Sequence, residues 1–297
     1  MNLRLKPLFV PLIPLVLFGI SCSPRKEEFD IKGLEKILKL NQVNEQILHL
    51  SESNYSTGFS FAVISDSRPA GNEIYENLRR QIEDHHPDFI IHTGDFVSNA
   101  VPNQMTEYFK SIEDYTLPIF HVLGNHELQE SFQDGDFKFD YKDSRFVLIN
   151  NSHDEFYGLK DNQIVWLKDQ LDDATPENKY VFMHVPPSKP FEWLQDDKVN
   201  PFRGEDEFLD LVNKFNVTMS AYGHRHYFAT TLFEGSRYLI SAGGGAPLYQ
   251  TSPSSEKTID SLYISNHHFV IIDHKTIEKV PDKIYVHFQN ERILELQ

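Results

Sequence analysis

From residue 59 onward, short apolar runs alternate with amphipathic segments. The apolar runs are five to eight residues long and are typical of buried strands. They cover residues 59–65, 88–93, 117–124, 145–150, 179–183 and 217–223. Two amphipathic helices are predicted between them, at residues 73–84 and 162–171, because apolar residues recur there every three or four positions. This alternation predicts an α/β fold.

The flanking regions have different patterns. Apolar residues recur at helical spacing over residues 31–48 and predict one or two helices that lie on the domain. Near the other end, residues 236–243, 267–273 and 283–288 are typical of hairpin-forming strands and are expected to form a second sheet packed on the first. We therefore predict a tether and helical segment at residues 22–54 and one domain at residues 55–297.

The first 21 residues have the pattern of a signal peptide. An apolar run at residues 7–20 follows Arg4 and Lys6, and it is too short to span a bilayer comfortably. Its three prolines also oppose a stable helix. Residues 1–21 are therefore expected to direct export.

The apolar run ends at Cys22, which is the only cysteine of the chain. Small residues before a cysteine resemble the lipobox of bacterial lipoproteins, so Cys22 is predicted to be acylated and to hold the protein on a membrane. The next residue is Ser23 and not an aspartate, and in Gram-negative lipoproteins the same resemblance then favours the outer membrane. The alternative is a plain secretory signal with an incidental cysteine. A single cysteine excludes both an intramolecular disulfide and a cysteine-based zinc site.

The net charge of −16 argues against binding of nucleic acid through a basic face. A small phosphate ester would also be repelled by this charge unless local cations reversed it, as bound metal ions do. The composition gives no indication of the oligomeric state.

Polar signatures follow five of the predicted strands. They are Asp66, Gly94-Asp95, Gly124-Asn125-His126-Glu127, His184 and Gly223-His224-Arg225-His226. Because the carboxyl ends of strands in α/β sheets meet at one crevice, these side chains are expected to lie close together. Carboxylate, amide and imidazole ligands suit Mn, Fe, Zn or Mg-like divalent ions.

These motifs, in this order, resemble the calcineurin-like metallophosphoesterases, a family with D-x-H, G-D, G-N-H-[DE], lone-His and G-H-x-H motifs. The resemblance implies a four-layer αββα sandwich of two mixed sheets flanked by helices. It also implies two divalent metal ions. The implied ligands are Asp66 and His226 for the first ion, Asp95 as the bridge, and Asn125, His184 and His224 for the second.

The same resemblance assigns the chemistry. A metal-activated water would attack phosphorus, and His126 would stabilise the phosphoryl group or protonate the leaving oxygen. Glu127 is expected to orient His126 through its other ring nitrogen. The expected function is hydrolysis of a phosphomonoester or phosphodiester. The alternative is a weak or inactive surface lipoprotein that binds phosphorylated ligands.

One motif departs from the family, because Arg68 stands where D-x-H has its histidine. Arginine has no lone pair for a metal, but its planar fork can bind phosphate. Three outcomes stay open: the first metal persists with other ligands, one metal binds tightly and one weakly, or the protein only binds phosphates. Purple acid phosphatases, a branch of the superfamily, also lack this histidine, but the position of their compensating tyrosine is Ser98 here.

The segment at residues 188–204 is a candidate for shaping the substrate pocket, because it carries aromatic and cationic side chains. The alternative is a surface loop whose aromatic residues pack onto the domain.

Overall fold

The structure is a computed structural model. It describes residues 29–51, 58–68, 72–127, 135–153, 156–173, 175–195, 201–254, 258–275, 282–289 and 292–296. The predicted signal peptide, Cys22 and the domain boundary near residue 55 lie outside the described residues. Among the helices described, none combines the length and the apolar character that a membrane crossing needs.

Helices and strands alternate through the first two thirds of the chain, and strands dominate the last third. The helices are α1 Ile31–Ser51, α2 Glu73–Asp84, α3 Pro102–Ile112, α4 Asp161–Leu171, the 3₁₀ helix η1 Lys189–Phe191 and α5 Glu205–Lys214. The strands are β1 Phe59–Ile64, β2 Phe89–His92, β3 Ile119–His121, β4 Phe137–Tyr141, β5 Ser144–Leu148, β6 Tyr157–Gly158, β7 Asn178–Phe182, β8 Leu194–Gln195, β9 Phe202–Arg203, β10 Met219–Tyr222, β11 Phe228–Phe233, β12 Ser236–Ser241, β13 Ser252–Pro253, β14 Leu262–Ile264, β15 His268–His274, β16 Lys283–Phe288 and β17 Ile293–Leu296.

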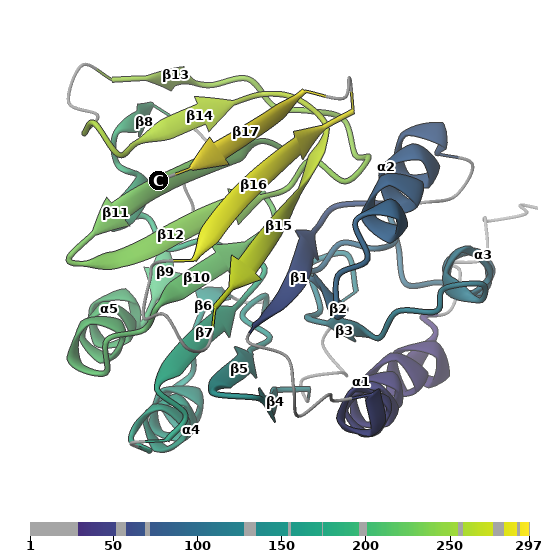
Figure 1. Cartoon of the computed structure of the whole chain (residues 1–297), viewed down its shortest axis with the longest axis horizontal. Helices are drawn as coiled ribbons and strands as arrows, with labels where there is room; N and C mark the ends of the chain where they lie inside the picture. The colour runs from purple at the N-terminus through teal and green to yellow at the C-terminus, as the bar shows by residue number, and fades with distance from the viewer. Residues whose placement is uncertain are drawn as a thin grey trace, which may run out of the picture.

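Two mixed sheets lie face to face (Figure 1). The six-stranded sheet has the order β17-β16-β15-β1-β2-β3, and the seven-stranded sheet has the order β14-β11-β12-β10-β7-β5-β4. Each sheet contains a run of parallel strands: β1, β2 and β3 at one side of the first, and β5, β7, β10 and β12 in the middle of the second.

The central strands are apolar on both faces because each face is covered. In β1, Phe61 and Val63 point into the core between the sheets, whereas Ala62 and Ile64 point to the helices outside. This alternation explains the continuous apolar runs of the sequence. The inter-sheet core is rich in aromatic rings, for example Phe61 stacked on Phe89 with 5.4 Å between ring centroids. Burial of each such side chain contributes about 1.5–3 kcal/mol.

Helices cover both outer faces, so the sandwich has four layers (Figure 1). Helix α2 buries Tyr75, Leu78 and Ile82 against the six-stranded sheet. Helices α1 and α3 share a second apolar cluster on that side of the molecule, and α4 and α5 pack on the seven-stranded sheet. The predicted αββα sandwich is thereby confirmed.

The assignment of residues 236–243, 267–273 and 283–288 to one sheet was wrong. Of these three segments, only the first, which forms β12, joins the seven-stranded sheet. The second forms β15, which pairs antiparallel with β1 and brings β16 with it into the six-stranded sheet. The physical reason is the open edge of β1, whose backbone groups need a hydrogen-bonding partner when buried. Each main sheet thus contains strands from both halves of the chain.

Candidate metal centre and active site

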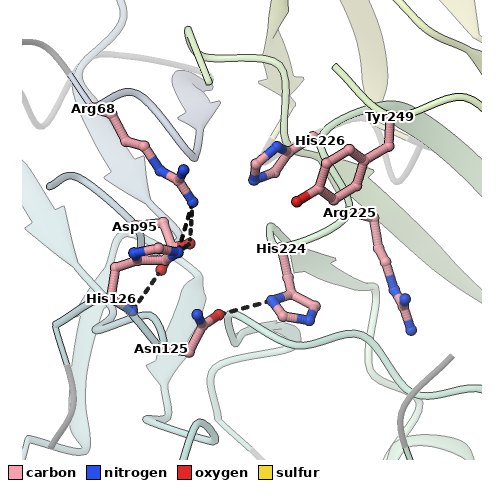
Figure 2. A pocket seen from close by; sticks show the side chains of 8 residues that line it. All are labelled: Arg68, Asp95, Asn125, His126, His224, Arg225, His226 and Tyr249. Carbon is pink, nitrogen blue, oxygen red and sulfur yellow. Dashed lines mark hydrogen bonds and ion pairs between the residues drawn. The ribbon is translucent and has the colours of Figure 1, made fainter. Parts of the chain in front are cut away.

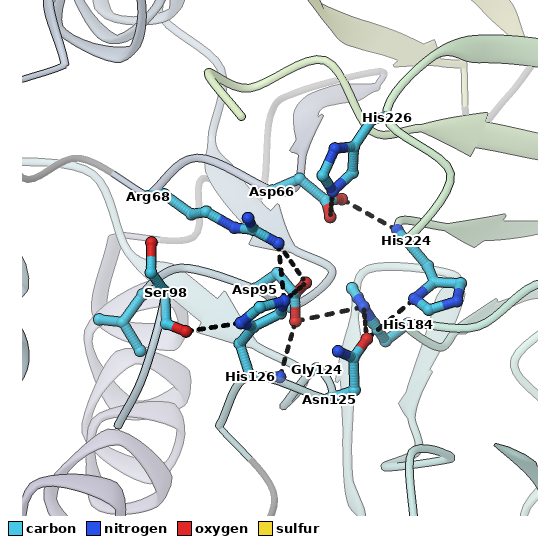
Figure 3. A network of polar contacts seen from close by, with 12 residues as sticks. Asp66, Arg68, Asp95, Ser98, Gly124, Asn125, His126, His184, His224 and His226 are labelled. Atoms are coloured by element: carbon cyan, nitrogen blue, oxygen red, sulfur yellow. Dashed lines mark hydrogen bonds and ion pairs between the residues drawn. The ribbon is translucent and has the colours of Figure 1, made fainter. Parts of the chain in front are cut away.

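The five polar signatures meet at one end of the sandwich, between the two sheets (Figure 3). Asp66, Asp95 and the 124–127 segment follow β1, β2 and β3 of the six-stranded sheet. His184 and the 223–226 segment follow β7 and β10 of the other sheet. The crevice is therefore made by the carboxyl ends of two sheets, and backbone bonds such as Asp66 N–H to Gly94 O, at 3.0 Å, hold neighbouring loops together.

The loops turn sharply at the site. Five of its residues have left-handed backbone conformations, with φ between +40° and +71°: Asp66, Arg68, Asp95, His224 and His226. Such conformations are uncommon for residues other than glycine and concentrate at functional sites, where the surrounding structure enforces them. Gly124 is required for a different reason, because a Cβ there would meet the backbone nitrogen of Asp95 at 2.5 Å.

Ligand atoms converge in the centre of this crevice. Asp66, Asp95 and His184 are all buried, and one ligand atom from each lies within 4.8 Å of the others. Asn125 Oδ1 is 3.1 Å from His184 Nε2 and 2.9 Å from His224 Nδ1. The structure therefore brings together all six side chains that the sequence predicted as metal ligands, including His226, whose Nε2 is 3.1 Å from Asp66 Oδ1.

The hydrogen bonds of two histidines direct their Nε2 atoms into the crevice. His184 donates from Nδ1 to the Thr93 carbonyl at 2.8 Å, and its Nε2 faces Asp95 Oδ1 at 3.3 Å. His226 donates from Nδ1 to the Pro247 carbonyl at 2.6 Å. Its Nε2 faces Asp66 Oδ1, a buried atom that has no hydrogen-bond partner among the described residues. Acceptor atoms that face one another are stabilised by a cation between them, so this donor set fits a divalent metal.

The electrostatics of the site also favour positive charge beside Asp95. Burial alone disfavours the imidazolium of His184, but the adjacent Asp95 outweighs burial and raises the pKa of His184 to about 9. Burial likewise opposes ionisation of Asp95, yet His184 and His126 hold the pKa of this carboxyl well below its usual value. His224 has the opposite shift, because burial and the neighbouring His184 lower its pKa.

The predicted contact between Glu127 and His126 was wrong. His126 donates from Nδ1 to the Ser98 carbonyl at 2.6 Å, so a backbone group orients its ring. Glu127 is fully buried and accepts three backbone N–H bonds of 2.8–3.0 Å, from Asp95, Val97 and Gly124. Buried backbone N–H groups need acceptors, and the Glu127 side chain supplies them for three. Glu127 therefore connects the loops after β2 and β3 and does not orient the ring of His126.

Arg68 points into the crevice. Its Nη2 donates to Asp95 Oδ2 at 3.2 Å and to His126 Nε2 at 2.8 Å (Figure 3). Because Nδ1 of His126 already donates to Ser98, Nε2 is the acceptor in the second bond.

A cavity of about 330 Å³ opens above these groups (Figure 2). It is lined by Arg68, Asp95, Asn125, His126, His224, Arg225, His226 and Tyr249. Sequence reasoning missed Tyr249, whose ring stacks on His226 with 4.2 Å between centroids. No motif marks this tyrosine, and only the path of the chain after β12 brings it to the site. Arg225 was not assigned a role either, although it lies inside the G-H-x-H motif.

The segment at residues 188–204 does not line this cavity in its described part. Phe191, Trp193 and Phe202 are buried in the cluster between the seven-stranded sheet and its helices. The alternative interpretation, that these aromatic residues pack onto the domain, is confirmed.

The fold and the converging ligands define a metallophosphoesterase. Residues 59–228, more than half of the chain, match the model of the calcineurin-like phosphoesterase family, and the chain belongs to that family. The resemblance identified from the motifs is thus confirmed, and the protein is classed as a hydrolase of phosphoric ester bonds.

Similar proteins of known description are distant in sequence. A probable glycerophosphodiester phosphodiesterase of Arcobacter nitrofigilis is 23% identical over 69% of this chain and 74% of its own length. A probable cyclic nucleotide phosphodiesterase of Rhodococcus erythropolis is 25% identical over 50% of this chain and 54% of its own. A glycerophosphodiester phosphodiesterase of Enterobacter lignolyticus is 26% identical over 50% of this chain and 59% of its own length.

Solved structures share the fold. A purple acid phosphatase from yellow lupin (Lupinus luteus) has a TM-score of 0.62 at 14% identity, over 82% of this chain and 54% of that one. GAP50, the anchor in the inner membrane complex of Plasmodium, has a TM-score of 0.60 at 14% identity, over 82% of this chain and 89% of that one. At these identities the likeness concerns the fold alone.

Proposed function

We propose that this protein hydrolyses a small phosphodiester in a metal-dependent reaction. The observation that carries the proposal is the set of buried acceptor atoms from Asp66, Asp95 and His184 within 4.8 Å of one another, directly beneath an open cavity. The phosphodiesterase names of three relatives support a diester over a monoester. A cavity of about 330 Å³ is at the small end of ligand sites and favours a small substrate.

Two groups of side chains would hold metal, and Asp95 belongs to both. One group adds Asn125, His184 and His224, and the other adds Asp66 and His226. Bound divalent ions would polarise a phosphoryl oxygen and lower the pKa of a water molecule. The expectation of two ions rests on the family resemblance, and the number that this chain holds depends on Arg68.

The remaining steps belong to the residues of the cavity. Arg68 would turn from His126 to the phosphoryl oxygens, where its guanidinium forms charge-assisted hydrogen bonds. His126 Nε2, released from Arg68, would in its protonated form give a proton to the leaving oxygen, while the proton of the attacking water passes to solvent. The oxygen of water bonds to phosphorus as the bond to the leaving alcohol breaks. The products are a phosphomonoester and an alcohol.

A substrate panel tests this proposal. We expect purified protein, stripped of metal and supplied with Mn, to hydrolyse bis(p-nitrophenyl) phosphate and glycerophosphodiesters faster than p-nitrophenyl phosphate. Asp95→Asn should reduce kcat/KM by at least roughly a hundredfold, since it weakens both ligand groups. Asp210→Asn, at an exposed position of α5, is the matched control and should retain full activity.

The same panel tests the alternative function. Arg68 already neutralises part of the Asp95 charge, and this contact favours a protein that binds phosphorylated ligands without cleaving them. Binding of a phosphodiester without turnover under any metal, or turnover indifferent to Asp95, would reject the enzymatic proposal.

We also propose export of the protein and attachment to the bacterial outer membrane through lipid on Cys22. The support is the sequence pattern before this residue. Cys22→Ser should move the protein from the membrane fraction to the soluble fraction. Membrane association that survives this change would contradict the lipid anchor.

A further inference from the structure

The two oxygens of the Asp95 carboxylate have different partners, because Arg68 binds only one of them. Asp95 Oδ1 accepts the backbone N–H of His126 at 3.1 Å and lies 3.3 Å from His184 Nε2. Asp95 Oδ2 accepts from the Arg68 guanidinium at 3.2 Å. One oxygen therefore faces the ligand group of Asn125, His184 and His224, while the other is bound to a permanent positive charge (Figure 3).

The position of Arg68 is set by the loop after β1. Ser67 Oγ bonds to His92 Nε2 at 2.9 Å, and the Asn72 side chain donates to the Ser67 carbonyl at 3.2 Å. The Asp66 carbonyl accepts from the backbone of Ala246 at 2.8 Å. The Arg68 side chain is only 20% exposed. These contacts direct the guanidinium at Asp95.

The two metal-ligand groups are consequently unequal. The group of Asp95, Asn125, His184 and His224 offers four side chains. The other group offers Asp66 and His226 with the shared Asp95, and the arginine bound to Asp95 supplies no lone pair. A divalent ion in this second group would also be repelled by the guanidinium, because like charges a few ångströms apart in a buried site interact strongly.

We propose that the single positive charge of the Arg68 guanidinium partly replaces a divalent ion in the group of Asp66, Asp95 and His226. The chain would then hold one divalent ion tightly, through Asp95, Asn125, His184 and His224. The facing acceptor atoms of Asp66 and His226 would hold the other ion more weakly. This inference rests on the metal-dependent site of the proposed function, and it predicts a stoichiometry that does not depend on the substrate.

Metal content tests the inference without an activity assay. Protein loaded with Mn or Zn is dialysed against metal-free buffer, and the ions retained per chain are measured by plasma mass spectrometry. We expect one ion per chain for the native protein and two for Arg68→His, which restores a lone pair at this position. Calorimetric titration should show two unequal steps in the native protein, with the weaker step tightened by roughly ten- to a hundredfold in Arg68→His.

Two further variants show whether a change in metal binding comes from the added histidine or from the removal of the arginine charge. Arg80→His, on the exposed face of α2, adds a histidine elsewhere and should still retain one ion. Arg68→Met removes the charge without adding a ligand, so the weak step should tighten by less than in Arg68→His. It also gives a second test if Arg68→His fails to fold.

Metal retention tests this inference, and hydrolysis tests the proposed function, so the failure of one can be told from the failure of the other. Native protein that retains two ions, or Arg68→His that retains one, would overturn the inference while leaving hydrolysis possible. Native protein that retains one ion but cleaves no phosphate ester would support the inference and reject the hydrolytic function. Retention of no ion would overturn the inference, and the substrate panel with added Mn would still decide the hydrolytic function.

Discussion

At the scale of single residues, the structure brings together the six side chains that the motifs named as candidate ligands, but one supporting contact differed. Glu127 lies next to His126 in the chain and still makes no contact of the expected kind with it. Its three backbone N–H partners come from loops that meet only in the folded protein. Burial and the nearby Asp95 raise the pKa of Glu127 to about 8. The side chain of Glu127 therefore connects these loops, although its buried environment disfavours the ionised carboxylate.

Substitution of Glu127 tests this structural role. In Glu127→Gln, the amide nitrogen would face backbone N–H donors, so at least one buried donor loses its partner. We expect a loss of about 1–3 kcal/mol in the free energy of unfolding, measured by urea denaturation. Glu107→Gln, on the exposed surface of α3, should change stability by less than about 0.5 kcal/mol. A destabilisation equal in both variants would contradict the assignment.

At the scale of elements, prediction succeeded where the apolar pattern was strong. The helix at residues 73–84 was predicted with the bounds that α2 has, and each of the six apolar runs overlaps a strand. The N-terminal segment forms the single helix α1. Helices α3 and α5 and strands β4 and β11 were not predicted individually, because their polar residues outnumber or interrupt the apolar ones. These elements are stabilised by packing on the sheets, and this packing cannot be read from the local sequence pattern.

Helix α1 has a role that its sequence alone did not show. Strand β3 is the edge of the six-stranded sheet, and Asn41 of α1 bonds to both backbone groups of His121 in this strand. The distances are 3.0 Å to the carbonyl and 2.8 Å from the N–H. The asparagine thus satisfies groups that an open edge would leave unpaired.

Removal of this side chain should destabilise the domain. Asn41→Ala leaves the buried N–H and carbonyl of His121 without partners, and we expect a loss of about 2–4 kcal/mol in the free energy of unfolding by urea denaturation. Gln46→Ala, at an exposed position of the same helix, is the control and should be nearly neutral. If Asn41→Ala were equally neutral, α1 would not stabilise this edge.

At the scale of the whole molecule, a polar network joins the two sheets at a position separate from the proposed metal centre. His274 of β15 lies 2.7 Å from Asp282 and 3.2 Å from Asp143, which follows β4 of the other sheet. Tyr180 of β7 donates to Asp282 at 2.5 Å. Burial lowers the pKa of His274, but Asp282 and Asp143 outweigh it and raise the pKa above the usual 6.5.

The direction of this shift predicts how stability depends on pH. Because the folded state binds the His274 proton more tightly than the unfolded state, its contribution is complete below pH 6.5 and is lost as the pH rises through the folded pKa. We expect the stability difference between native protein and His274→Gln to shrink from pH 6 to pH 9. Urea denaturation in the presence of a chelator measures this difference in the free energy of unfolding without a contribution from bound metal.

His49→Gln is the matched control, because His49 is exposed on α1. Its stability difference from native protein should stay within about 0.5 kcal/mol over the same pH range, as for most surface substitutions. A His274→Gln difference that stays constant, or grows with pH, would show that the network is not held by a protonated histidine.

The sequence by itself determined the class of fold, the family and the six candidate ligands, since apolar periodicity and short motifs are local properties of the chain. It also contained the departure at Arg68. The tertiary structure alone decided which sheet each strand joins, that Ser98 orients His126, and that Tyr249 covers His226. It also decided that the guanidinium of Arg68 binds Asp95. These facts depend on contacts between residues far apart in the chain, whose geometry is fixed only when the two sheets pack together.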